Sequence, residues 1–378
     1  MENAFGSGRA FSIGVEEELF LVDPVTGQQV NASAAVIEHL PKTRWAGEIA
    51  PELHACQVEL ISEPCSRSAD AVRALHRMRE VVLQTGAGLL AAGTHPSALE
   101  GEAEITDKER YERIRNLLGD AAVTPVAGLH IHVGMPDAET AIRVFNGLRR
   151  HLPLLIALGA NSPFRHGRDT ALASAREVTI RAWPRSGVPR AMHDFADFCA
   201  MAEVLVRAAG VPDYTWFWWK LRPHPRLGTV EIRGVDVQST QAETAALAAL
   251  VHCLCRHEAQ AGDATSDPPA EVVEEGVFRA ARFGVRAELP DAEGRLRPAR
   301  ELLTEVLNTV RGHARELDCE EQLDLLAGLV ARGGGAGRQR AYYEIAGMSA
   351  LLRGLTRITA GDEEPDRVSS SPRAAEPA

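Results

Sequence analysis

The sequence predicts an α+β fold in which the strands of an antiparallel sheet come first and helices follow. Segments with an apolar residue at every second position, typical of strands with one polar face, lie in the first two thirds of the 378 residues. Beyond Gln238 the chain reads as almost wholly helical. Strands that precede helices, rather than alternate with them, favour an antiparallel sheet with a helical C-terminal third over a doubly wound parallel sheet.

Acidic and histidine side chains are concentrated in four strand-like or extended segments, which are residues 14–22, 51–61, 128–134 and 228–236. Residues two apart on a strand point to the same face. Three same-face pairs follow, namely Glu16 with Glu18, His130 with His132, and Glu231 with Arg233. Glu17 should face the opposite side. Solvent-facing strands do not usually need glutamates and histidines among Val, Ile and Leu, so these pairs indicate a buried cleft.

The other elements of the first two thirds follow from turn and capping signals. Asp23-Pro24 and Thr26-Gly27 mark a turn, after which residues 28–30 should return as a hairpin partner of the first strand. Helices are expected over residues 66–85, 107–118, 137–158 and 193–209, with a short strand at residues 89–93 and a strand–turn–strand over residues 215–234. Pro153 should kink or interrupt the third of these helices.

Residues 161–189 form a long segment rich in Gly, Pro, Ser and Arg. A loop of this length inside a compact domain is usually functional or disordered, and its arginines favour function. Helices are expected beyond it at about residues 240–260, 269–283, 298–315 and 320–355, the last one broken at residues 333–335. Residues 1–10 are expected to be a flexible N-terminus, residues 11–358 a single catalytic domain, and residues 359–378 a disordered tail.

Composition narrows the class of protein. The net charge of −11 argues against a nucleic-acid-binding surface. The chain has no run of eighteen apolar residues, and its N-terminus lacks the apolar centre of a signal peptide, so we expect no membrane association and a cytoplasmic location. The six cysteines show neither zinc-finger nor CxxC spacing and are most simply buried thiols.

The clustered carboxylates suit a divalent cation. Hard oxygen ligands would come from Glu16, Glu18, Glu52, Glu59 and Glu231. One imidazole, from His130, changes the preference for Mg²⁺ or Mn²⁺ little. Such ions around a nucleoside triphosphate would bridge its phosphates and offset charge as the terminal phosphoryl group leaves. Bidentate binding of phosphate or a substrate carboxylate would then fall to Arg168, Arg176, Arg222 and Arg233.

Each of these patterns has a simpler explanation when taken alone. An exposed alternating strand explains Glu-x-Glu, a core or zinc pair explains His-x-His, and a solvated surface explains the arginine-rich segment. Trp216, Trp218 and Trp219 indicate core packing more than a nucleobase platform. Four acid or imidazole clusters in one chain, without a Walker or Gly-rich dinucleotide motif, nevertheless favour a shared metal site.

Six segments carry a family resemblance, and they read GVEEELFLV, ITDKERY, GLHIHVG, NSPFRHGRDT, RPHPRLGTVEIRGVDVQ and GRQRA. Together they resemble the type 2 glutamate–cysteine ligases, bacterial ATP-dependent carboxylate–amine ligases related to glutamine synthetase. The resemblance extends from Phe11 to Leu355, with the segments in the expected order. It implies a glutamine synthetase-like curved antiparallel sheet, lined by metal ligands and flanked by helices.

The resemblance also implies a reaction. A substrate carboxylate attacks the γ-phosphate of ATP to give an acyl phosphate, and an amine then displaces phosphate to form an amide. The nominal substrates are L-glutamate and L-cysteine, giving γ-glutamylcysteine, ADP and phosphate, although many members are weak on this pair. The implied co-substrate is ATP with Mg²⁺ or Mn²⁺, the partners are small amino acids and amines, and relatives suggest self-association.

Residue roles carry over by position. The resemblance places metal ligands at Glu16, Glu18, Glu52, Glu59, His130 and Glu231. It places ATP or phosphate contacts at His132, Arg168, Arg222 and Arg233, with Arg176 and Arg233 as the catalytic arginines. Three residues depart from the family pattern, which are Arg165 and Phe278 in place of tryptophan and Ala171 in place of glycine. They lie near the substrate loop and the late helices, so they concern substrate choice more than ATP chemistry.

Two alternatives remain beside the ligase. The first is a zinc-dependent hydrolase that uses His130 and His132 with a glutamate as base, and it would work without ATP. The second is a non-catalytic nucleotide- or amino-acid-binding homologue that kept the scaffold. Acid or imidazole residues in all four segments disfavour this second alternative.

Overall fold

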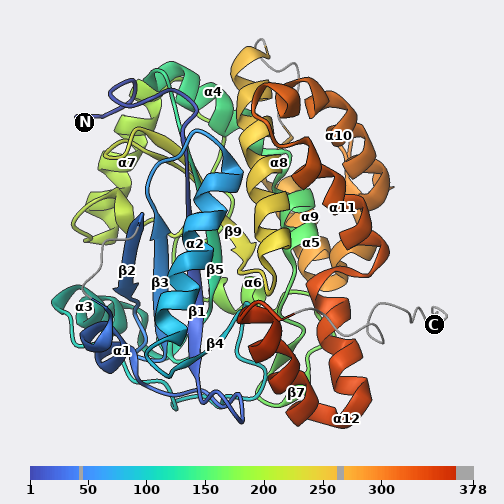
Figure 1. Cartoon of the computed structure of the whole chain (residues 1–378). Helices are drawn as coiled ribbons and strands as arrows, with labels where there is room; N and C mark the ends of the chain where they lie inside the picture. The colour runs from blue at the N-terminus through green and yellow to red at the C-terminus, as the bar shows by residue number, and fades with distance from the viewer. Residues whose placement is uncertain (42–45, 262–267, 363–378) are drawn as a thin grey trace.

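The computed structural model describes residues 1–41, 46–261 and 268–362, and an antiparallel sheet forms its centre (Figure 1). The sheet has seven strands in the order β2-β3-β1-β5-β9-β8, with β4 pairing to β1. These strands are β1 (Ile13–Val22), β2 (Gly47–Pro51), β3 (Gln57–Ser62), β4 (Gly88–Leu90), β5 (Gly128–Gly134), β8 (Leu221–His224) and β9 (Thr229–Asp236). Two small hairpins lie outside it, formed by β6 (Phe164–Arg165) with β7 (Arg168–Asp169) and by β10 (Glu288–Pro290) with β11 (Leu296–Pro298).

Helices fill the connections of the sheet and most of the C-terminal third. The first seven are α1 (Ser33–His39), α2 (Ser68–Leu83), α3 (Glu109–Leu118), α4 (Ala138–Arg149), α5 (Leu152–Gly159), α6 (Ala175–Ile180) and α7 (Phe195–Ala209). The others are α8 (Gln241–Gln260), α9 (Ala270–Phe283), α10 (Ala299–Glu316), α11 (Glu320–Ala331) and α12 (Gly334–Thr359). The predicted α+β class with an antiparallel sheet and a helical C-terminal third is confirmed.

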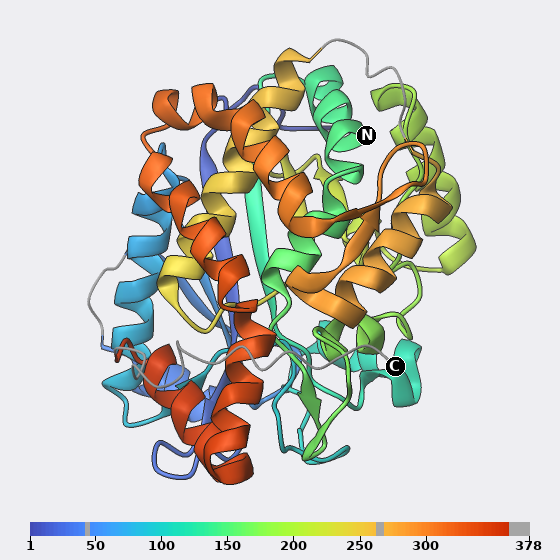
Figure 2. The ribbon, with the colours of Figure 1, turned by 90° about the vertical axis from the view of Figure 1, so that its right-hand side faces the viewer.

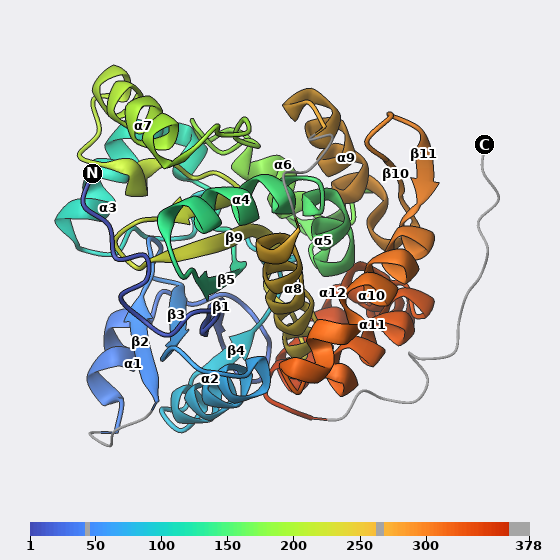
Figure 3. The same ribbon diagram turned by 90° about the horizontal axis from the view of Figure 1, so that it is seen from above.

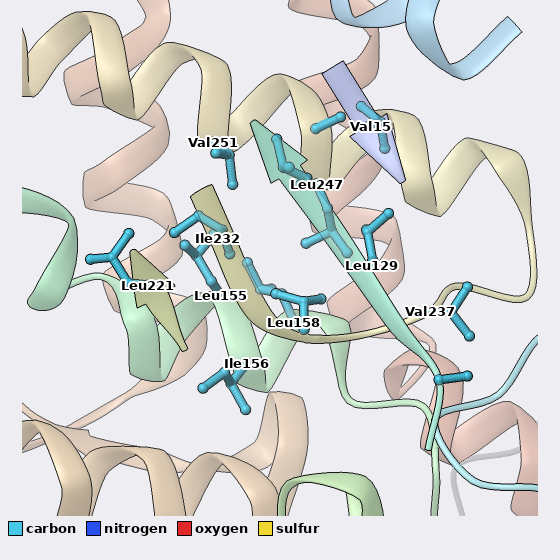
Figure 4. Packing of buried hydrophobic residues seen from close by; sticks show 14 of the residues in the cluster. Val15, Leu129, Leu155, Ile156, Leu158, Leu221, Ile232, Val237, Leu247 and Val251 are labelled. Atoms are coloured by element: carbon cyan, nitrogen blue, oxygen red, sulfur yellow. The ribbon is translucent and has the colours of Figure 1, made fainter. Parts of the chain in front are cut away.

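One face of the sheet is apolar and is covered by helices. Helices α2 and α8 run along this face, and α9 to α12 form a further group beyond α8 (Figures 1 and 3). Figure 2, which faces that group, shows the orange and red C-terminal helices in front of the strands. The contact layer between β5, β9, α5 and α8 is drawn in Figure 4 and includes Leu129, Leu155, Leu158, Ile232, Leu247 and Val251. This packing leaves the opposite face of the sheet for polar side chains.

A β-bulge interrupts the pairing of β5 with β9. Ile131 faces Ile232, whereas Leu129 faces Val235, so β9 carries one extra residue at this point. The backbone N–H groups of Arg233 and Gly234 both donate to the Lys220 carbonyl oxygen, at 2.8 and 3.1 Å. The bulge thus lies at Arg233, one of the arginines that the sequence singled out.

Most expected elements are present, with two corrections. Residues 28–30 return to the first strand but form only a single bridge, between Val22 and Gln29, because the neighbouring positions on that edge of β1 are taken by β3, which pairs Gln57 with Phe20. The interruption expected at Pro153 is present, since residues 137–158 form two helices, and Pro153 lies in the first turn of α5, where its missing N–H has no helical partner to lose. The loop expected over residues 161–189 contains α6 and the β6–β7 hairpin.

The break predicted at residues 333–335 is present, because α11 ends at Ala331 and α12 begins at Gly334. Gly333, between the two helices, has a φ of +87°, which glycine adopts without strain. A second break at Ala346 and Gly347 was not expected. At the other end of the chain, Ala4 and Gly6 donate backbone hydrogen bonds to Pro225 and Met135. The division into residues 1–10, 11–358 and 359–378 stays a prediction, and most of the tail lies outside the described residues.

The remaining composition-based expectations concern cysteines, tryptophans and membranes. All six cysteines are free, and Cys253 and Cys255 are fully buried. The three tryptophans of residues 216–219 are buried in the core, as predicted. Among the described helices, none has the length and apolar character needed to cross a membrane.

Candidate active site

The polar face of the sheet opens into a cleft of about 350 Å³. Cross-strand register places its acid and imidazole groups in adjacent positions, because Glu18 lies opposite Glu59 and Glu16 lies opposite His130. Further along the sheet, His132 lies opposite Glu231. Side chains directly opposite each other on antiparallel strands are about 4.5–5.5 Å apart at Cβ. The four predicted segments therefore meet in one site.

His130 bridges the two glutamates of β1. Its Nδ1 lies 3.1 Å from Glu16 Oε2, and its Nε2 lies 3.6 Å from Glu18 Oε1. Glu18 also accepts a 2.5 Å hydrogen bond from the backbone N–H of Gly128. The imidazole is 4% exposed and the two carboxylates only 18% and 12%, so these charges interact with little solvent between them.

The pairs Glu18–Glu59, Glu16–His130 and His132–Glu231 form a row across the sheet, which we call the ladder. Glu231 lies at one end of this ladder, between two arginines. Its carboxylate accepts hydrogen bonds from Arg222 Nε and Nη2, at 2.9 and 2.8 Å, and is ion-paired with Arg233. Burial alone would raise the pKa of Glu231, but these two guanidinium groups hold it well below its ordinary value. His132 lies 3.6 Å from Glu231 and 3.3 Å from Glu16, and those carboxylates raise its pKa against the effect of burial.

Glu52 and Glu59 lie at the end of the cleft opposite Glu231, where positive charge is scarce. In the described part of the chain, neither forms an ion pair, and Glu18 is paired only with His130. Burial and the nearby Glu18 carboxylate raise the pKa of Glu52 to about 7. Burial, followed by the Glu16 and Glu52 carboxylates, raises the pKa of Glu59 well above its ordinary value. A crowd of buried carboxylates of this kind is stable in ionised form only beside a cation.

The donor set fits divalent cations of the magnesium type. Two groups have ligand atoms within 4.8 Å of one another, one made of Glu16, His130 and Glu231 and the other of Glu18, Glu59 and His130. Each group offers two carboxylates and one imidazole, which suits Mg²⁺ or Mn²⁺. The two histidines of β5 do not share a group, so the pair of imidazoles that the zinc hydrolase requires is not assembled among the described residues.

Arg176 enters the cleft from α6. Ser174 caps this helix by accepting from the Glu177 N–H, and the Ser174 hydroxyl donates to buried Asp236 at 2.8 Å. Ser162 donates to the same carboxylate at 2.6 Å and accepts from the Arg176 N–H at 3.1 Å. The guanidinium donates from Nη2 to the Arg233 carbonyl oxygen at 3.1 Å, while its buried Nε has no partner among the described residues. The start of α6 thus fixes the backbone of Arg176, and the buried Nε–H of its guanidinium remains available.

Arg168 is the predicted site residue that the structure does not bring to the cleft. It is exposed on β7 of the small hairpin, and it does not line the cavity. The hairpin turns it outward and places its neighbour Asp169 against Arg340 instead, at 2.7 and 3.0 Å. The structure thus places Arg168 outside the cleft, and its role as an ATP or phosphate contact stays a prediction.

The remaining cleft wall comes from residues that received no role from the sequence. They are mainly Arg110 and Tyr111 on α3, Trp183 after α6, Trp218 before β8, and His224 and Arg226 around the β8–β9 turn. Arg110 and Tyr111 belong to the ITDKERY segment, so the resemblance carried a signal for them. Burial lowers the pKa of His224 to about 4, which leaves a neutral ring in the cleft wall. The tryptophans gave no such signal, because core packing explains them equally well.

A second cavity of about 390 Å³ continues from the cleft past Glu16, His132 and Leu227, which line both spaces. Its walls are the N-terminal segment, the start of β1 and the ends of β3 and β5, with small residues such as Gly14 and Gly134. We call it the N-terminal cavity. It adjoins the Glu16 and Glu231 end of the ladder rather than the Glu52 and Glu59 end.

Comparison with known proteins agrees with this architecture. The model of glutamate–cysteine ligase family 2 (GCS2) matches residues 12–352. The chain belongs to this family. A relative named "Putative glutamate--cysteine ligase 2-3", from Rubrobacter xylanophilus, is 40% identical over 95% of this chain and 100% of its own length. Another, named "Putative glutamate--cysteine ligase 2" and from Gloeobacter violaceus, is 33% identical over 90% of this chain and 94% of its own.

Solved structures show the same fold at low sequence identity. A glutamate–cysteine ligase from Francisella tularensis in complex with AMP has a TM-score of 0.67 and 12% sequence identity. The match covers 96% of the present chain and 91% of the Francisella chain. A bifunctional glutathione synthetase from Pasteurella multocida also has a TM-score of 0.67, with 16% identity, covering 93% of this chain and 52% of that one. At these identities the likeness concerns the fold alone.

Proposed function

We propose that this family member is an ATP-dependent carboxylate–amine ligase, with glutamate and cysteine as its nominal substrates. The observation that carries the proposal is the ladder of Glu18–Glu59, Glu16–His130 and His132–Glu231 pairs beside Arg233. Carboxylates that bind a divalent cation, next to arginines that bind phosphate, are what phosphoryl transfer from ATP to a carboxylate requires. Membership in the family supports the same reaction.

The reaction needs no nucleophilic side chain. A carboxylate oxygen of the acid attacks the γ-phosphorus, an O–P bond forms, and the bond to the β,γ-bridging oxygen breaks to release ADP. The amine then attacks the carbonyl carbon of the acyl phosphate, a C–N bond forms, the C–O bond breaks so that phosphate leaves with the oxygen, and the amine nitrogen loses a proton. A divalent cation, when bound by the ligand groups of the cleft, would offset the negative charge of the phosphates.

The protein contributes position and charge. The two ligand groups, which contain Glu16 and Glu18 respectively, would hold divalent cations, with Glu52 beside the second group. Arg233 and Arg222 are fixed by Glu231 and stabilise negative charge on the transferred phosphoryl group without reorganising. Arg176, whose Nε–H is unused, binds the substrate carboxylate or the phosphate.

The N-terminal cavity is where the nucleoside of ATP fits. Phosphates held beside Glu16 and His132 by a cation and by the arginines of the cleft would leave the rest of the nucleotide to extend past these two residues, which also line this cavity. Its volume of about 390 Å³ is of the size that small-molecule sites have. The acid and amine then occupy the end lined by Glu52, Tyr111 and Arg176.

Phosphate release from ATP with Mg²⁺ tests the proposed function. We expect release that depends on both an acid and an amine when L-glutamate and other amino acids are scanned against an amine panel that includes L-cysteine. ATP binding without release for any pair would instead favour a non-catalytic homologue. Activity on a hydrolysable substrate without ATP would favour the hydrolase, although the two histidines are not arranged for it.

Replacing Glu16 tests the ladder. Glu16→Gln keeps the shape of the side chain and removes the charge shared by His130 and a cation. Groups that stabilise transition-state charge in this way are worth about 2.7–4 kcal/mol, so we expect kcat to fall about 100-fold or more. Circular dichroism should show an unchanged fold. Turnover like that of the wild type would refute the assignment.

Filling the N-terminal cavity tests the orientation of ATP. A Cβ on Gly14 would meet His132 Cβ at 3.9 Å, which is ordinary contact, so Gly14→Ala should be tolerated. Gly14→Leu would occupy the cavity and raise the KM for ATP about tenfold, equivalent to about 1.4 kcal/mol, with a smaller effect on the KM of the acid. An equal rise for both substrates, or for neither, would contradict this orientation.

A further inference from the structure

A separate arginine-lined cavity lies where the C-terminal helices meet the loop after α5. It has a volume of about 340 Å³ and shares no lining residue with the catalytic cleft. Its charged lining consists of Arg282, Arg286, Arg340 and Asp169. We call it the arginine pocket. A local excess of positive charge is notable in a chain whose net charge is −11.

The arginines of this pocket differ in how much of their hydrogen-bonding capacity is used. Arg340 neutralises Asp169 through two hydrogen bonds and donates a third to the Leu172 carbonyl oxygen at 2.8 Å. Arg282 donates to the Ala171 carbonyl oxygen. Arg286 has no hydrogen bond or ion pair within the described residues. Two guanidinium groups thus keep free N–H donors and an uncompensated charge, and guanidinium binds carboxylate and phosphate in bidentate fashion.

The rest of the lining suits a compact ligand. Gly333, Ala336 and Gly337 form one wall, and their small side chains allow a ligand to approach the backbone. Phe283, 45% exposed, offers a flat apolar surface beside the Arg282 guanidinium, which lies 5.2 Å from the ring centroid. Anionic groups can therefore bind while a less polar part of the same molecule contacts the ring.

The pocket is connected to the catalytic cleft through the start of α6. Ala171 and Ala173 line the pocket, and Arg176, three residues further on, lines the cleft. The backbone N–H groups of Ala173 and Ser174 both donate to the carbonyl oxygen of Ala281 on α9, at 2.7 and 2.9 Å. The next residue along α9 is Arg282. A ligand that holds Arg282 therefore also holds the segment from which Arg176 projects.

We propose that the arginine pocket binds a small polyanion, a phosphorylated or polycarboxylate metabolite, and that its binding orders the segment leading to Arg176. The proposal does not depend on which reaction the cleft performs. It depends on Arg286, which is exposed and has no hydrogen bond or ion pair within the described residues, and on the donors that Arg282 leaves unused. It also depends on the small residues that line the pocket beside them and on the α9 contacts to residues 173 and 174.

Calorimetric titration of the full chain tests the binding step, with pyrophosphate as one probe and tricarballylate as the other. The titration is done without divalent cations, so that no cation links the probe to the cleft glutamates, and the pocket variants separate binding in the pocket from binding at the cleft arginines. We expect one site per chain, and the stronger probe tells a phosphate from a carboxylate ligand. Arg286→Gln should weaken binding about tenfold or more, and Arg282→Gln with Arg286→Gln should abolish it.

Arg353→Gln is the matched control, because Arg353 is exposed on α12 and does not line the pocket. It should bind the probe like the wild type. Because Arg286 has no partner within the described residues, its substitution should leave the fold intact. No binding of either probe to the wild type, or undiminished binding to Arg286→Gln, would overturn the proposal.

Amide hydrogen exchange tests the connection to the cleft. A saturating probe should slow exchange over residues 170–180 in the wild type and in Arg353→Gln, and leave it unchanged in Arg286→Gln. Binding without slower exchange in this segment would overturn the coupling to Arg176.

Discussion

At the scale of single residues, the cleft combines strand residues of the sheet with Arg176, which projects from the short helix α6. The two-residue period of a strand is a property of the backbone, so Glu16, Glu18 and His130 could be assigned to one face without knowing the fold. Arg168 and Arg176 come from the same arginine-rich segment, yet one lies in solvent and the other in the cleft. Nothing in their spacing distinguishes them, because the hairpin and the Ser174 cap that separate them depend on tertiary contacts.

The glutamates of the cleft are not equivalent tests of its chemistry. Glu231 is 1% exposed and compensates the buried Arg222 and the half-buried Arg233, so Glu231→Gln would also leave buried guanidinium charge and destabilise the fold. Glu16 contacts only imidazoles and the cleft. For this reason the loss of activity in Glu16→Gln reports on chemistry, whereas a loss in Glu231→Gln would combine chemistry with folding.

A departure from the family pattern has a backbone consequence at Ala171. Its φ is +61°, in the left-handed region that costs a non-glycine residue about 1–2 kcal/mol. Ala171→Gly should relieve that strain and, after the greater entropy of glycine in the unfolded chain, raise the free energy of unfolding by about 0.5–1 kcal/mol. Urea denaturation measures it.

The control for this change is Ala196→Gly in the first turn of α7, where the backbone is helical and glycine should destabilise by about 1 kcal/mol. Equal losses in both variants would contradict the strain at Ala171. The other two departures lie outside the cleft, since Arg165 donates to Thr179 at 2.8 Å and Phe278 is 53% exposed on α9. Nothing in the structure explains why tryptophan is replaced at these two positions.

At the scale of secondary-structure elements, the first strand is anchored from behind by Glu17. This residue faces away from the cleft, as its position between Glu16 and Glu18 predicts, and is 1% exposed. It accepts hydrogen bonds from Arg79 on α2, at 2.8 and 2.9 Å, and from Thr244 on α8, at 2.7 Å. Arg79 also donates to carbonyl oxygens after β9 and at the end of α12. Four elements are thereby fixed to the strand that carries the ladder.

Breaking the Glu17–Arg79 ion pair should lower the free energy of unfolding substantially. Glu17→Gln leaves the Arg79 charge buried, and removal of one partner of a buried ion pair costs about 3–5 kcal/mol. Chemical denaturation should show that loss, and the double variant Glu17→Met with Arg79→Met should recover most of it. Glu109→Gln, which breaks an exposed i,i+4 pair with Arg113, should change stability by no more than about 0.5 kcal/mol. A Glu17→Gln loss as small as that of Glu109→Gln would show that the pair contributes little.

At the scale of the whole molecule, the chain concentrates uncompensated negative charge in one place. Arginines gather at the Glu231 end of the cleft, whereas Glu18, Glu52 and Glu59 crowd together at the other end. The family resemblance predicted the antiparallel sheet. The second arginine at Glu231 required the structure, because Arg222 reaches Glu231 only through the pairing of β8 with β9, whereas Arg233 lies two residues along the same strand.

This asymmetry predicts opposite effects of one substitution with and without Mg²⁺. In EDTA, Glu59→Gln removes a buried carboxylate that Glu16, Glu52 and Glu18 repel, so the variant should melt at a higher temperature than the wild type. With Mg²⁺ the order should reverse. An ion at 100 times its dissociation constant stabilises the folded state by about 2.7 kcal/mol, and only the wild type keeps the full ligand set. Glu48→Gln, at an exposed position of β2, should behave like the wild type in both buffers. Differential scanning fluorimetry measures all three, and an equal Mg²⁺ response in Glu59→Gln and the wild type would place the cation elsewhere.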